Sequence, residues 1–479
     1  MLHVELVSRS FLAGGAMTTQ PHSAPILLPP QQVAAFAAQL QGDLITPANS
    51  GYAAARQVWN GVIDKSPALI VRPRTVDDVV RALHFARDHA LPVTVRGGGH
   101  NVAGHALCEG VVLDLSLMRG VTVDAQARIA RVEGGATWAE VDAACQAFGL
   151  ATPGGVVSET GVAGLTLGGG LGWLRRKHGL SCDQVRAYEV VTAAGQVVRV
   201  SADSEPELFW ALRGGGGGFG VVTAFEFALH PLGPDVMFAM VFYPASLDIL
   251  QAYRAYGQTA PEEVSSFAIC GQVPESDVFP AEAHGQPFVL LAALYAGEAQ
   301  AGERLLEPLR HCGQPIADFS AVQPYVGVQQ LFNEDYPNGR KYYWKSAYLA
   351  GLPDEALQLA LDFAASSPSA LSTVDIWPLG GAIDDLNASA SAYPHRGAPY
   401  LLAVEANWDE PGEAAQEANV AWARLCLEQC APYATGGVYL NFPGFEGESV
   451  ALPEAQRAQQ ARLQQIKHLW DAGALFRSV

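Results

Sequence analysis

The sequence of 479 residues is short of charge, and of positive charge above all. Charged residues make up 16% of it, against about 25% in an ordinary soluble protein. The 29 Lys and Arg are outnumbered by 48 Asp and Glu, and the net charge is −19. Nucleic acid and anionic membranes both select a basic surface, so we expect neither as a partner. With 49% hydrophobic residues, the chain also lacks the composition of a disordered protein.

Cysteine supplies no pattern typical of a metal site or a disulfide framework. The seven Cys are scattered and include no Cys-x-x-Cys pair, so we expect no metal and a reduced, cytoplasmic setting. No apolar run reaches the roughly 18 residues that a membrane-spanning helix needs. The first 25 residues carry Glu5 inside their apolar stretch, unlike a signal peptide. We interpret them as a loose tail, in which Met17 is an alternative start.

Glycine is abundant, with 49 residues, and it gathers in three runs before residue 221. The runs are Gly97–Gly99, Gly164–Gly172 and Gly214–Gly218. After residue 235 the chain changes to alternating strand and helix patterns without such runs. We therefore predict a tail over 1–40, a glycine-rich domain over 41–235, a second domain over 236–435 and a C-terminal segment over 436–479.

Local signals predict the elements of both halves. Thr75 and Thr137 precede amphipathic stripes, and each is followed three residues later by an acid, as at a helix start. Gly149 is placed to end the second helix, and a third helix is expected over 205–212. In the second half, helices are predicted over 246–258, 299–312, 354–366, 411–430 and 454–470. Strands are predicted over 236–243, 287–295, 341–349, 372–379, 400–408 and 437–442.

Several of these strands follow one another without a helix between them. That order favours an antiparallel sheet with helices on one face, and the fold class is therefore α+β.

The glycine runs match neither of the two commonest nucleotide motifs. Gly99–Gly104 has the spacing of a Walker A loop, but His105 and Ala106 follow in place of Lys and Ser or Thr. The run at Gly214 lies between a helix and a strand, which reverses the order of a dinucleotide-binding turn. Tight turns explain a single run. Three runs in one acidic half favour backbone N–H groups that hold a dinucleotide.

Three segments carry a recognisable pattern: VRGGGHNVAGHALCEGVVLDLS, PGGVVSETGVAGLTLGGGLGWLRRKHGLSCDQV and ELFWALRGGGGGFGVVT. They resemble the PCMH-type FAD-binding domain of the vanillyl-alcohol-oxidase superfamily. With VYLNF and IKHLWDAGALF, the chain resembles the berberine-bridge-enzyme-like flavin oxidases over about residues 45–479, most of all the bacterial branch that includes 6-hydroxy-D-nicotine oxidase. The resemblance implies FAD, a two-part FAD-binding domain, a substrate domain whose sheet roofs the flavin, and a C-terminal segment that returns to the FAD domain.

The resemblance implies a covalent bond between FAD and His100. In the family, the His that follows Gly-Gly-Gly is joined to the flavin 8α carbon, and a neutral imidazole is a good nucleophile for that position. The bond should raise the flavin potential. Outside this motif, a His that ends a strand and bonds a turn is the simpler interpretation, and His105 is a weaker candidate for the link.

Many relatives carry a second link from a Cys to flavin C6. The matching position lies near Val157, and no Cys occurs between Cys145 and Cys182, so we predict a single link. Two further departures affect local contacts. Gly218 replaces the Asn that the family has in its third glycine run, and the sequence ends at Val479 without the family's Asn-rich end.

The family's other FAD contacts carry over to residues that match its motifs: Arg96, Gly97, Gly98, Gly99, Asn101, Gly104, Thr160, Gly161, Gly164, Leu167, Gly168 and Val222. Tyr439 and Asn441 match the family's Tyr-x-Asn pair near the flavin. Two residues apart on a predicted strand, both are expected on one side of it.

The implied reaction moves a hydride to flavin N5 from a C–H next to O–H or N–H of a small organic substrate, and O2 then reoxidises the flavin to give H2O2. Tyr439 is the first candidate for the base, although a phenol with a pKa of about 10 needs help from its surroundings. Glu405 is the second, because burial in an apolar strand raises a carboxyl pKa. A salt-bridged Glu at the rim is an equal alternative.

Candidate substrate contacts come from two strands. Tyr343 and Lys345 share one face of their strand, opposite Tyr342 and Trp344, and the sequence leaves open which face is turned to the flavin. Asp375 is expected to bond base or substrate, or else to lie at the surface. The rival functions are a flavin dehydrogenase with an acceptor other than O2 and a flavin carrier without catalysis. Substrate identity and oligomeric state stay open.

Overall fold

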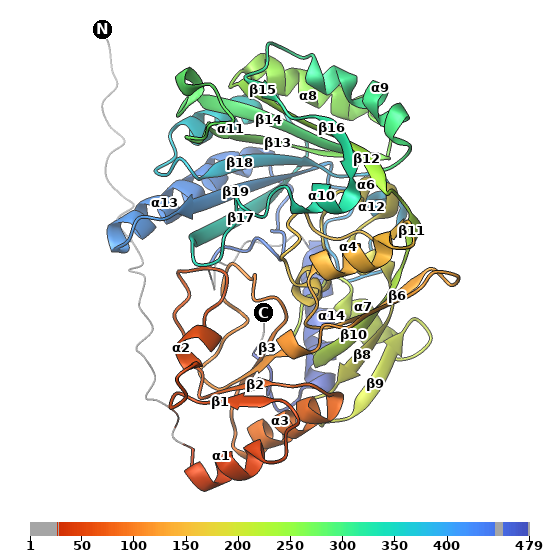
Figure 1. Ribbon diagram of the computed structural model, residues 1–479, viewed down its shortest axis with the longest axis vertical. Coiled ribbons are helices and arrows are strands. Elements are labelled where there is room, and N and C mark those ends of the chain that lie inside the picture. The colour runs from red at the N-terminus through yellow and green to blue at the C-terminus, as the bar shows by residue number, and fades with distance from the viewer. Residues whose placement is uncertain (1–25, 27, 446–453, 478–479) are drawn as a thin grey trace.

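The computed structural model describes residues 26, 28–445 and 454–477. Figure 1 shows two parts, one above the other: a glycine-rich half with the N-terminal strands, and a second half in which helices lie on the outer side of a large sheet. The first 25 residues, with Glu5 and Met17, lie outside the described residues, as does Val479.

A small mixed sheet opens the glycine-rich half. Its strands are β1 (Asp43–Ile45), β2 (Leu69–Arg72), β4 (Val111–Asp114) and β3 (Val93–Arg96), in that order. β2, β4 and β3 run parallel, and α3 (Val76–Asp88) connects β2 to β3. α1 (Pro30–Ala37) packs Phe36 on Phe85 of α3, with ring centroids 4.3 Å apart.

A second sheet, fully antiparallel, completes this half. Its strands are β5 (Val121–Asp124), β6 (Ile129–Glu133), β10 (Val221–Ala228), β8 (Val185–Val191) and β9 (Val197–Ser201). The helices α4 (Trp138–Gln146), α7 (Pro206–Leu212) and α14 (Glu454–Trp470) contribute Trp138, Leu208 and Ile466 to its core. The two sheets together confirm the two-part architecture.

Short elements join these sheets to the rest of the chain: α2 (Tyr52–Ala55), β7 (Leu150–Ala151), α5 (Val162–Leu167), α6 (Arg175–His178), β11 (His230–Pro231) and the 3₁₀ turns Leu115–Leu117 and Ser181–Gln184.

The predicted helix starts are confirmed. The Asp78 N–H donates to Thr75 Oγ1 at 3.2 Å, and the Thr137 N–H donates to the Glu140 carboxylate at 2.9 Å. Gly149 has φ of +64°, a left-handed conformation that suits glycine after a helix.

The second half is built on one antiparallel sheet of eight strands: β12 (Asp235–Pro244), β13 (Val264–Gln272), β14 (Pro287–Tyr295), β15 (Ala317–Asp318), β16 (Ala321–Pro324), β17 (Lys341–Leu349), β18 (Thr373–Pro378) and β19 (Tyr400–Trp408). The order is β15-β12-β14-β13-β18-β19-β17, and β16 also pairs with β12. β13 is a strand that the sequence patterns did not predict.

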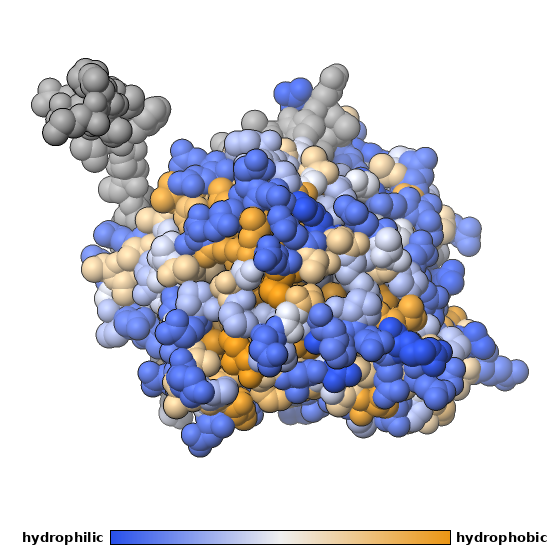
Figure 2. All heavy atoms as spheres, turned by 90° about the horizontal axis from the view of Figure 1, so that it is seen from above, coloured by the Kyte–Doolittle hydropathy of each residue, from blue (hydrophilic) through white to orange (hydrophobic). Residues whose placement is uncertain are grey.

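Four helices cover the outer face of this sheet: α8 (Leu247–Thr259), α9 (Ala299–Arg310), α11 (Asp354–Ala365) and α13 (Glu413–Cys430). The shorter α10 (Tyr325–Gln330) and α12 (Ala382–Asp385), with 3₁₀ turns at Ala281–Ala283 and Ala431–Tyr433, complete this half. One helix layer on an antiparallel sheet confirms the predicted α+β class. Seen from above, this end of the molecule presents mostly hydrophilic side chains with apolar ones between them (Figure 2).

The prediction of a strand over 437–442 is wrong. Tyr439 to Phe442 form a turn, closed by the Phe442 N–H that donates to the Tyr439 carbonyl at 2.8 Å. The segment follows the free edge of β17 and pairs with it only at two isolated bridges, Lys345–Pro443 and Leu349–Ala434. Two preceding glycines with positive φ, Gly436 and Gly437, bend the chain out of strand geometry.

The end of the described chain returns to the first sheet. The Val93 N–H donates to the Leu475 carbonyl at 2.9 Å, and the Arg477 N–H donates to the Val93 carbonyl at 3.1 Å. Within the part of the chain that the structure describes, no helix is both long and apolar enough to cross a membrane.

Candidate functional site

A large cavity lies between the glycine-rich loops and the inner face of the eight-stranded sheet. It holds about 1850 Å³ of space that no protein atom fills, its open mouth included. The cavity extends from the glycine loops to four strands of the sheet, so it is suited to a large ligand. Its floor contains residues of all three glycine runs, and its roof contains side chains of β13, β17, β18 and β19.

The glycines in the floor of the cavity are needed for two different structural reasons. A Cβ added to Gly98 would lie 2.5 Å from Gly161 Cα, and one added to Gly161 would lie 2.2 Å from the Gly98 nitrogen. The first and second glycine-containing loops therefore touch backbone to backbone. Gly164 differs, since a Cβ there would meet no atom within 4 Å. Because it borders the cavity, its missing side chain leaves room for a ligand, and the floor fits a flat dinucleotide such as FAD.

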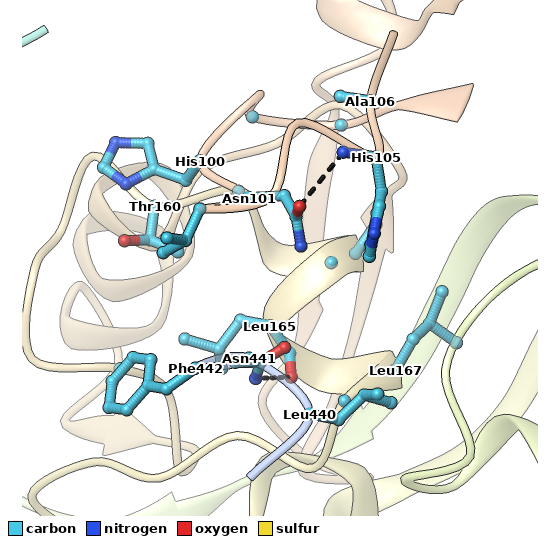
Figure 3. A pocket seen from close by; sticks show the side chains of 18 of the residues that line it. His100, Asn101, His105, Ala106, Thr160, Leu165, Leu167, Leu440, Asn441 and Phe442 are labelled. Carbon is cyan, nitrogen blue, oxygen red and sulfur yellow. Dashed lines mark hydrogen bonds between the residues drawn. The ribbon is translucent and has the colours of Figure 1, made fainter. Parts of the chain in front are cut away.

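His100 ends the first glycine run and borders the cavity. Its ring stacks on Trp59, with centroids 4.7 Å apart and planes inclined by 15°. Burial lowers the pKa of His100 to about 4, so the imidazole is neutral at pH 7. In Figure 3, His100, Asn101 and His105 lie on one side of the cavity, opposite residues 440–442.

Most of the predicted FAD contacts border this cavity: Gly97, Gly98, Gly99, His100, Asn101, Thr160, Gly161, Gly164, Leu167, Gly168, Val222, Tyr439 and Asn441. Arg96 and Gly104 are not among its lining residues. The Arg96 side chain turns away and donates to the Ala55 carbonyl at 2.9 Å. Gly104 packs on Ile63, where an added Cβ would come within 2.7 Å of a side-chain carbon.

Tyr439 lies where three N–H donors converge. Its hydroxyl oxygen accepts from the N–H groups of Gly170 at 3.2 Å and Leu171 at 3.1 Å, and from Asn441 Nδ2 at 2.9 Å. Burial raises the pKa of Tyr439 to about 12, although the three donors oppose that rise. Tyr439 and Asn441 are therefore brought together by the turn rather than by a shared strand face.

Two buried carboxyls lie in the roof. Asp375 on β18 and Glu405 on β19 are 1% and 2% exposed, and Thr373 of β18 pairs directly with Glu405. Tyr336 Oη donates to Glu405 Oε2 at 2.9 Å, whereas Asp375 Oδ1 has no hydrogen-bond partner among the described residues. Burial raises the pKa of Asp375 to about 7. The pKa of Glu405 is raised well above its usual range, first by burial and then by the charge of Asp375.

Tyr343 and Lys345 do not reach this cavity. Their partners on β19 are Ala406 and Val404, and Tyr343 belongs to the core between the sheet and its helices. Trp344, paired with Glu405, is turned to the cavity instead. Side-chain alternation allowed either face of β17 to be turned to the cavity, and the structure shows that it is the face with Trp344.

Aromatic side chains of the roof and rim were missed by the sequence interpretation: Trp59, Phe267, Phe332, Tyr336, Trp377 and Phe442. Trp377 had a usable signal, because it lies two residues after Asp375 on one strand. Phe267 lies on β13, which was not predicted, and Tyr336 lies in a loop.

Val157, near which the resemblance places the second flavin link of other family members, borders the cavity. Cys145 and Cys182 are buried, and neither is among the lining residues. Gly218 has φ of +95°, a region in which Gly and Asn are the best tolerated residues, so the exchange of one for the other is understandable. No cluster of three or more potential metal ligands occurs in the described part of the chain.

Comparisons with known proteins agree with this geometry. A family model described as "FAD binding domain" matches residues 67–201. The (R)-6-hydroxynicotine oxidase of Paenarthrobacter nicotinovorans is 30% identical over 457 residues, which cover 91% of this chain and 96% of that protein. An FAD-linked oxidoreductase of Dictyostelium discoideum is 32% identical over 352 residues, 72% of this chain and 74% of that protein.

Solved structures show the same architecture. The 6-hydroxy-D-nicotine oxidase of Arthrobacter nicotinovorans superposes with a TM-score of 0.79 at 27% identity, over 91% of this chain and 97% of that one. A berberine-bridge-enzyme-like protein of Physcomitrella patens gives 0.81 at 22% identity, over 93% and 97%. A grass pollen allergen with glucose dehydrogenase activity gives 0.76 at 22% identity, over 91% and 95%. The last two likenesses concern the fold alone.

Proposed function

The chain belongs to the family of FAD-linked oxidoreductases, and from this membership we propose that it is an oxidase of a small organic substrate. Its reaction removes a hydride from a C–H next to O–H or N–H and ends with the reduction of O2 to H2O2. One observation carries the proposal: a single cavity joins a glycine floor that fits FAD to a roof with two buried carboxyls. The seven free cysteines support a cytoplasmic setting.

The chain's own residues divide the work between floor and roof. FAD, when bound, supplies the hydride acceptor. The backbone of Gly97–Asn101 and Thr160–Gly168 would hold it, and the neutral imidazole of His100 would be the nucleophile for a single covalent link. Val157 in place of Cys supports the absence of a second link.

We assign the substrate proton to the carboxyl pair in preference to Tyr439. With a pKa of about 12, the Tyr439 phenol is almost entirely protonated at neutral pH. Asp375, with a pKa of about 7, is partly ionised there, and its unpartnered Oδ1 is able to take a proton. Tyr439 then serves to position residues around the flavin site.

The experiment for the proposed function is reduction of the enzyme by a substrate panel without O2, followed by admission of air. Bleaching of the flavin and formation of one equivalent of H2O2 support the oxidase. The rival function is that of a dehydrogenase. Two variants of the pollen allergen are described as a glucose oxidase and as a glucose dehydrogenase, so the same fold serves both activities. Bleaching that only an artificial acceptor reverses contradicts O2 as the acceptor.

The covalent link has its own test. Acid precipitation of the wild-type protein should leave the yellow colour in the pellet, and His100→Ala should release it into the supernatant. His105→Ala is the matched control, because it removes another cavity histidine and should leave the flavin attached. Proteolysis should yield one flavin-bearing peptide, and a peptide with a flavin–cysteine bond would contradict the single link.

A further inference from the structure

The side chain of His100 is held by a ring stack rather than by hydrogen bonds. Neither of its ring nitrogens has a hydrogen-bond partner among the described residues. The imidazole instead lies against the indole of Trp59, with ring centroids 4.7 Å apart and planes inclined by 15°. A side chain without such a contact moves among several rotamers. The indole face therefore selects the orientation of the imidazole.

Trp59 is itself bound to both halves of the molecule. Its backbone N–H donates to the carbonyl of Gly99, the residue before His100, at 3.2 Å. Its own carbonyl accepts from the Gly339 N–H at 2.8 Å, and its Nε1 donates to the Tyr336 carbonyl at 2.8 Å. Gly339 and Tyr336 belong to the loop that leads into β17. Trp59, which is 2% exposed, therefore joins the first glycine run to the sheet half.

Two aromatic rings of β17 fix the indole from behind. Tyr342 stacks on Trp59, with ring centroids 3.7 Å apart and planes inclined by 9°. His100 and Tyr342, both described, make no ring contact with each other, so they lie on opposite faces of the indole. The ring of Trp344 meets the indole at 70°, with centroids 5.1 Å apart. The sheet half thus sets the place of the indole, and the indole sets the place of the imidazole.

We propose that Trp59 is a positioning residue for the covalent flavin link: its indole, held in place by the sheet half, presents the His100 imidazole to the flavin 8α carbon. This inference rests on the proposed function, since it takes His100 as the attachment residue. Burial keeps the pKa of His100 at about 4 and the imidazole neutral, so orientation rather than protonation limits the reaction. A misplacement of about 1 Å is enough to slow a reaction by about 10²-fold.

Formation of the link is an oxidation of the 8α methyl group by the flavin itself. One methyl C–H and the imidazole N–H break, and one bond between nitrogen and carbon forms. The two protons and the electron pair released in this step reduce the isoalloxazine ring by two electrons, and O2 then takes them up as H2O2. Since FAD and air supply everything that the bond needs, the step can be followed with the purified chain.

The first test measures the rate of bond formation per bound FAD. Full-length protein from flavin-starved cells is mixed with FAD in air, bound FAD is determined by filtration, and samples are quenched in acid to separate linked from released flavin. Trp59→Leu should form the link about 10–100-fold more slowly than the wild type. Trp59→Phe restores a ring face and should recover most of the rate. A wild-type rate per bound FAD in Trp59→Leu overturns the proposal.

A variant in the sheet half tests the support of the indole, and it also decides the matter if Trp59→Leu does not fold. Tyr342→Leu keeps Trp59 and His100 but removes the ring behind the indole, so it should slow the link as well, by a smaller factor. Phe332→Leu is the matched control, because Phe332 is also a buried aromatic residue of the cavity but contacts Phe267 instead. A wild-type rate in Tyr342→Leu, or equal slowing in Phe332→Leu, overturns the proposal.

The inference and the proposed function fail differently. Wild-type protein whose flavin is fully released by acid contradicts both the link and the role of Trp59. Equal rates of link formation in the wild type and in Trp59→Leu contradict the role of Trp59 alone. Wild-type protein that carries linked flavin but gives no H2O2 with any substrate contradicts the oxidase and leaves the role of Trp59 intact.

Discussion

At the scale of single residues, the assignment of the base is the sharpest question. General-base loss typically slows a reaction by 10²–10⁴-fold, so Asp375→Asn should slow anaerobic flavin reduction by about that factor. Tyr439→Phe should have a smaller effect, because the phenol is already protonated at neutral pH. Stopped-flow absorbance of the flavin checks both. If Tyr439→Phe instead slows flavin reduction by 10²–10⁴-fold and Asp375→Asn reduces at the normal rate, the phenol is the base.

The pH dependence of flavin reduction separates the same alternatives. Asp375 accepts a proton only when ionised, so the rate should rise with pH and level off above about 7, the pKa of this carboxyl. A phenol base would let the rate rise further toward pH 12, the pKa of Tyr439. Rates measured from about pH 5 to 10 distinguish a plateau from a continued rise.

Site residues could be predicted from the sequence where they are neighbours in the chain. His100 and the glycines are adjacent in the chain, and the motif places them at the cavity without knowledge of the fold. Tyr343 and Lys345 were misplaced because alternation tells which residues share a face, not which face is inward. The Asp375–Glu405 pair depends on a register between two strands, which one sequence does not reveal.

At the scale of elements, the contact between the two glycine-containing loops predicts a contrast. Gly98→Ala should destabilise the fold with or without FAD, because the added Cβ would lie within 2.5 Å of the Gly161 backbone. Gly164→Ala should leave the cofactor-free protein folded, because no atom lies within 4 Å of the added Cβ and helix α5 tolerates Ala. It should nevertheless lower FAD content by filling the cavity. Flavin content and melting temperature, measured together, check the contrast.

Elements with continuous apolar runs were predicted closely, and two of the errors in the second half have local causes. β13 was missed because Ser265 and Ser266 interrupt its apolar pattern, although both are buried. The pattern of residues 437–442 predicts a strand, but Gly436 just before the segment and Gly437 at its start turn the chain. Its aromatic and branched residues pack at the cavity rather than in a sheet.

At the scale of the whole molecule, one buried amide joins the two halves. Asn60 Nδ2 donates to the carbonyls of Val102 at 2.7 Å and Tyr342 at 2.8 Å, and its Oδ1 accepts from the Tyr342 N–H at 3.1 Å. Asn60→Ala leaves these groups unpaired, at about 1–3 kcal/mol each, and should lower the melting temperature by several degrees. Asn387→Ala, in an exposed loop, is the control, and equal melting of the two variants contradicts the role of Asn60.

A second junction links α4 to α10 and should make stability depend on pH. Gln329 Nε2 donates to Asp142 Oδ2 at 3.0 Å, while Asp142 Oδ1 and Gln329 Oε1 have no partners among the described residues. Both of these atoms are acceptors unless the carboxyl is protonated, and burial raises the pKa of Asp142 to about 7. Between about pH 4 and 7 the folded state keeps a proton that the unfolded state loses, so this contribution to stability declines as pH rises.

Asp142→Asn should remove that dependence. An amide at this position offers Nδ2 as a donor and Oδ1 as an acceptor, which matches Gln329 at every pH. Urea midpoints at pH 5 and pH 7.5 should therefore differ less in the variant than in the wild type. Asp375 and Glu405 have the same sign of pH dependence and remain in both proteins, so only the change between the two proteins reports on Asp142. An unchanged difference would show that the carboxyl is ionised in the folded protein and that the junction is held by the single Gln329 hydrogen bond.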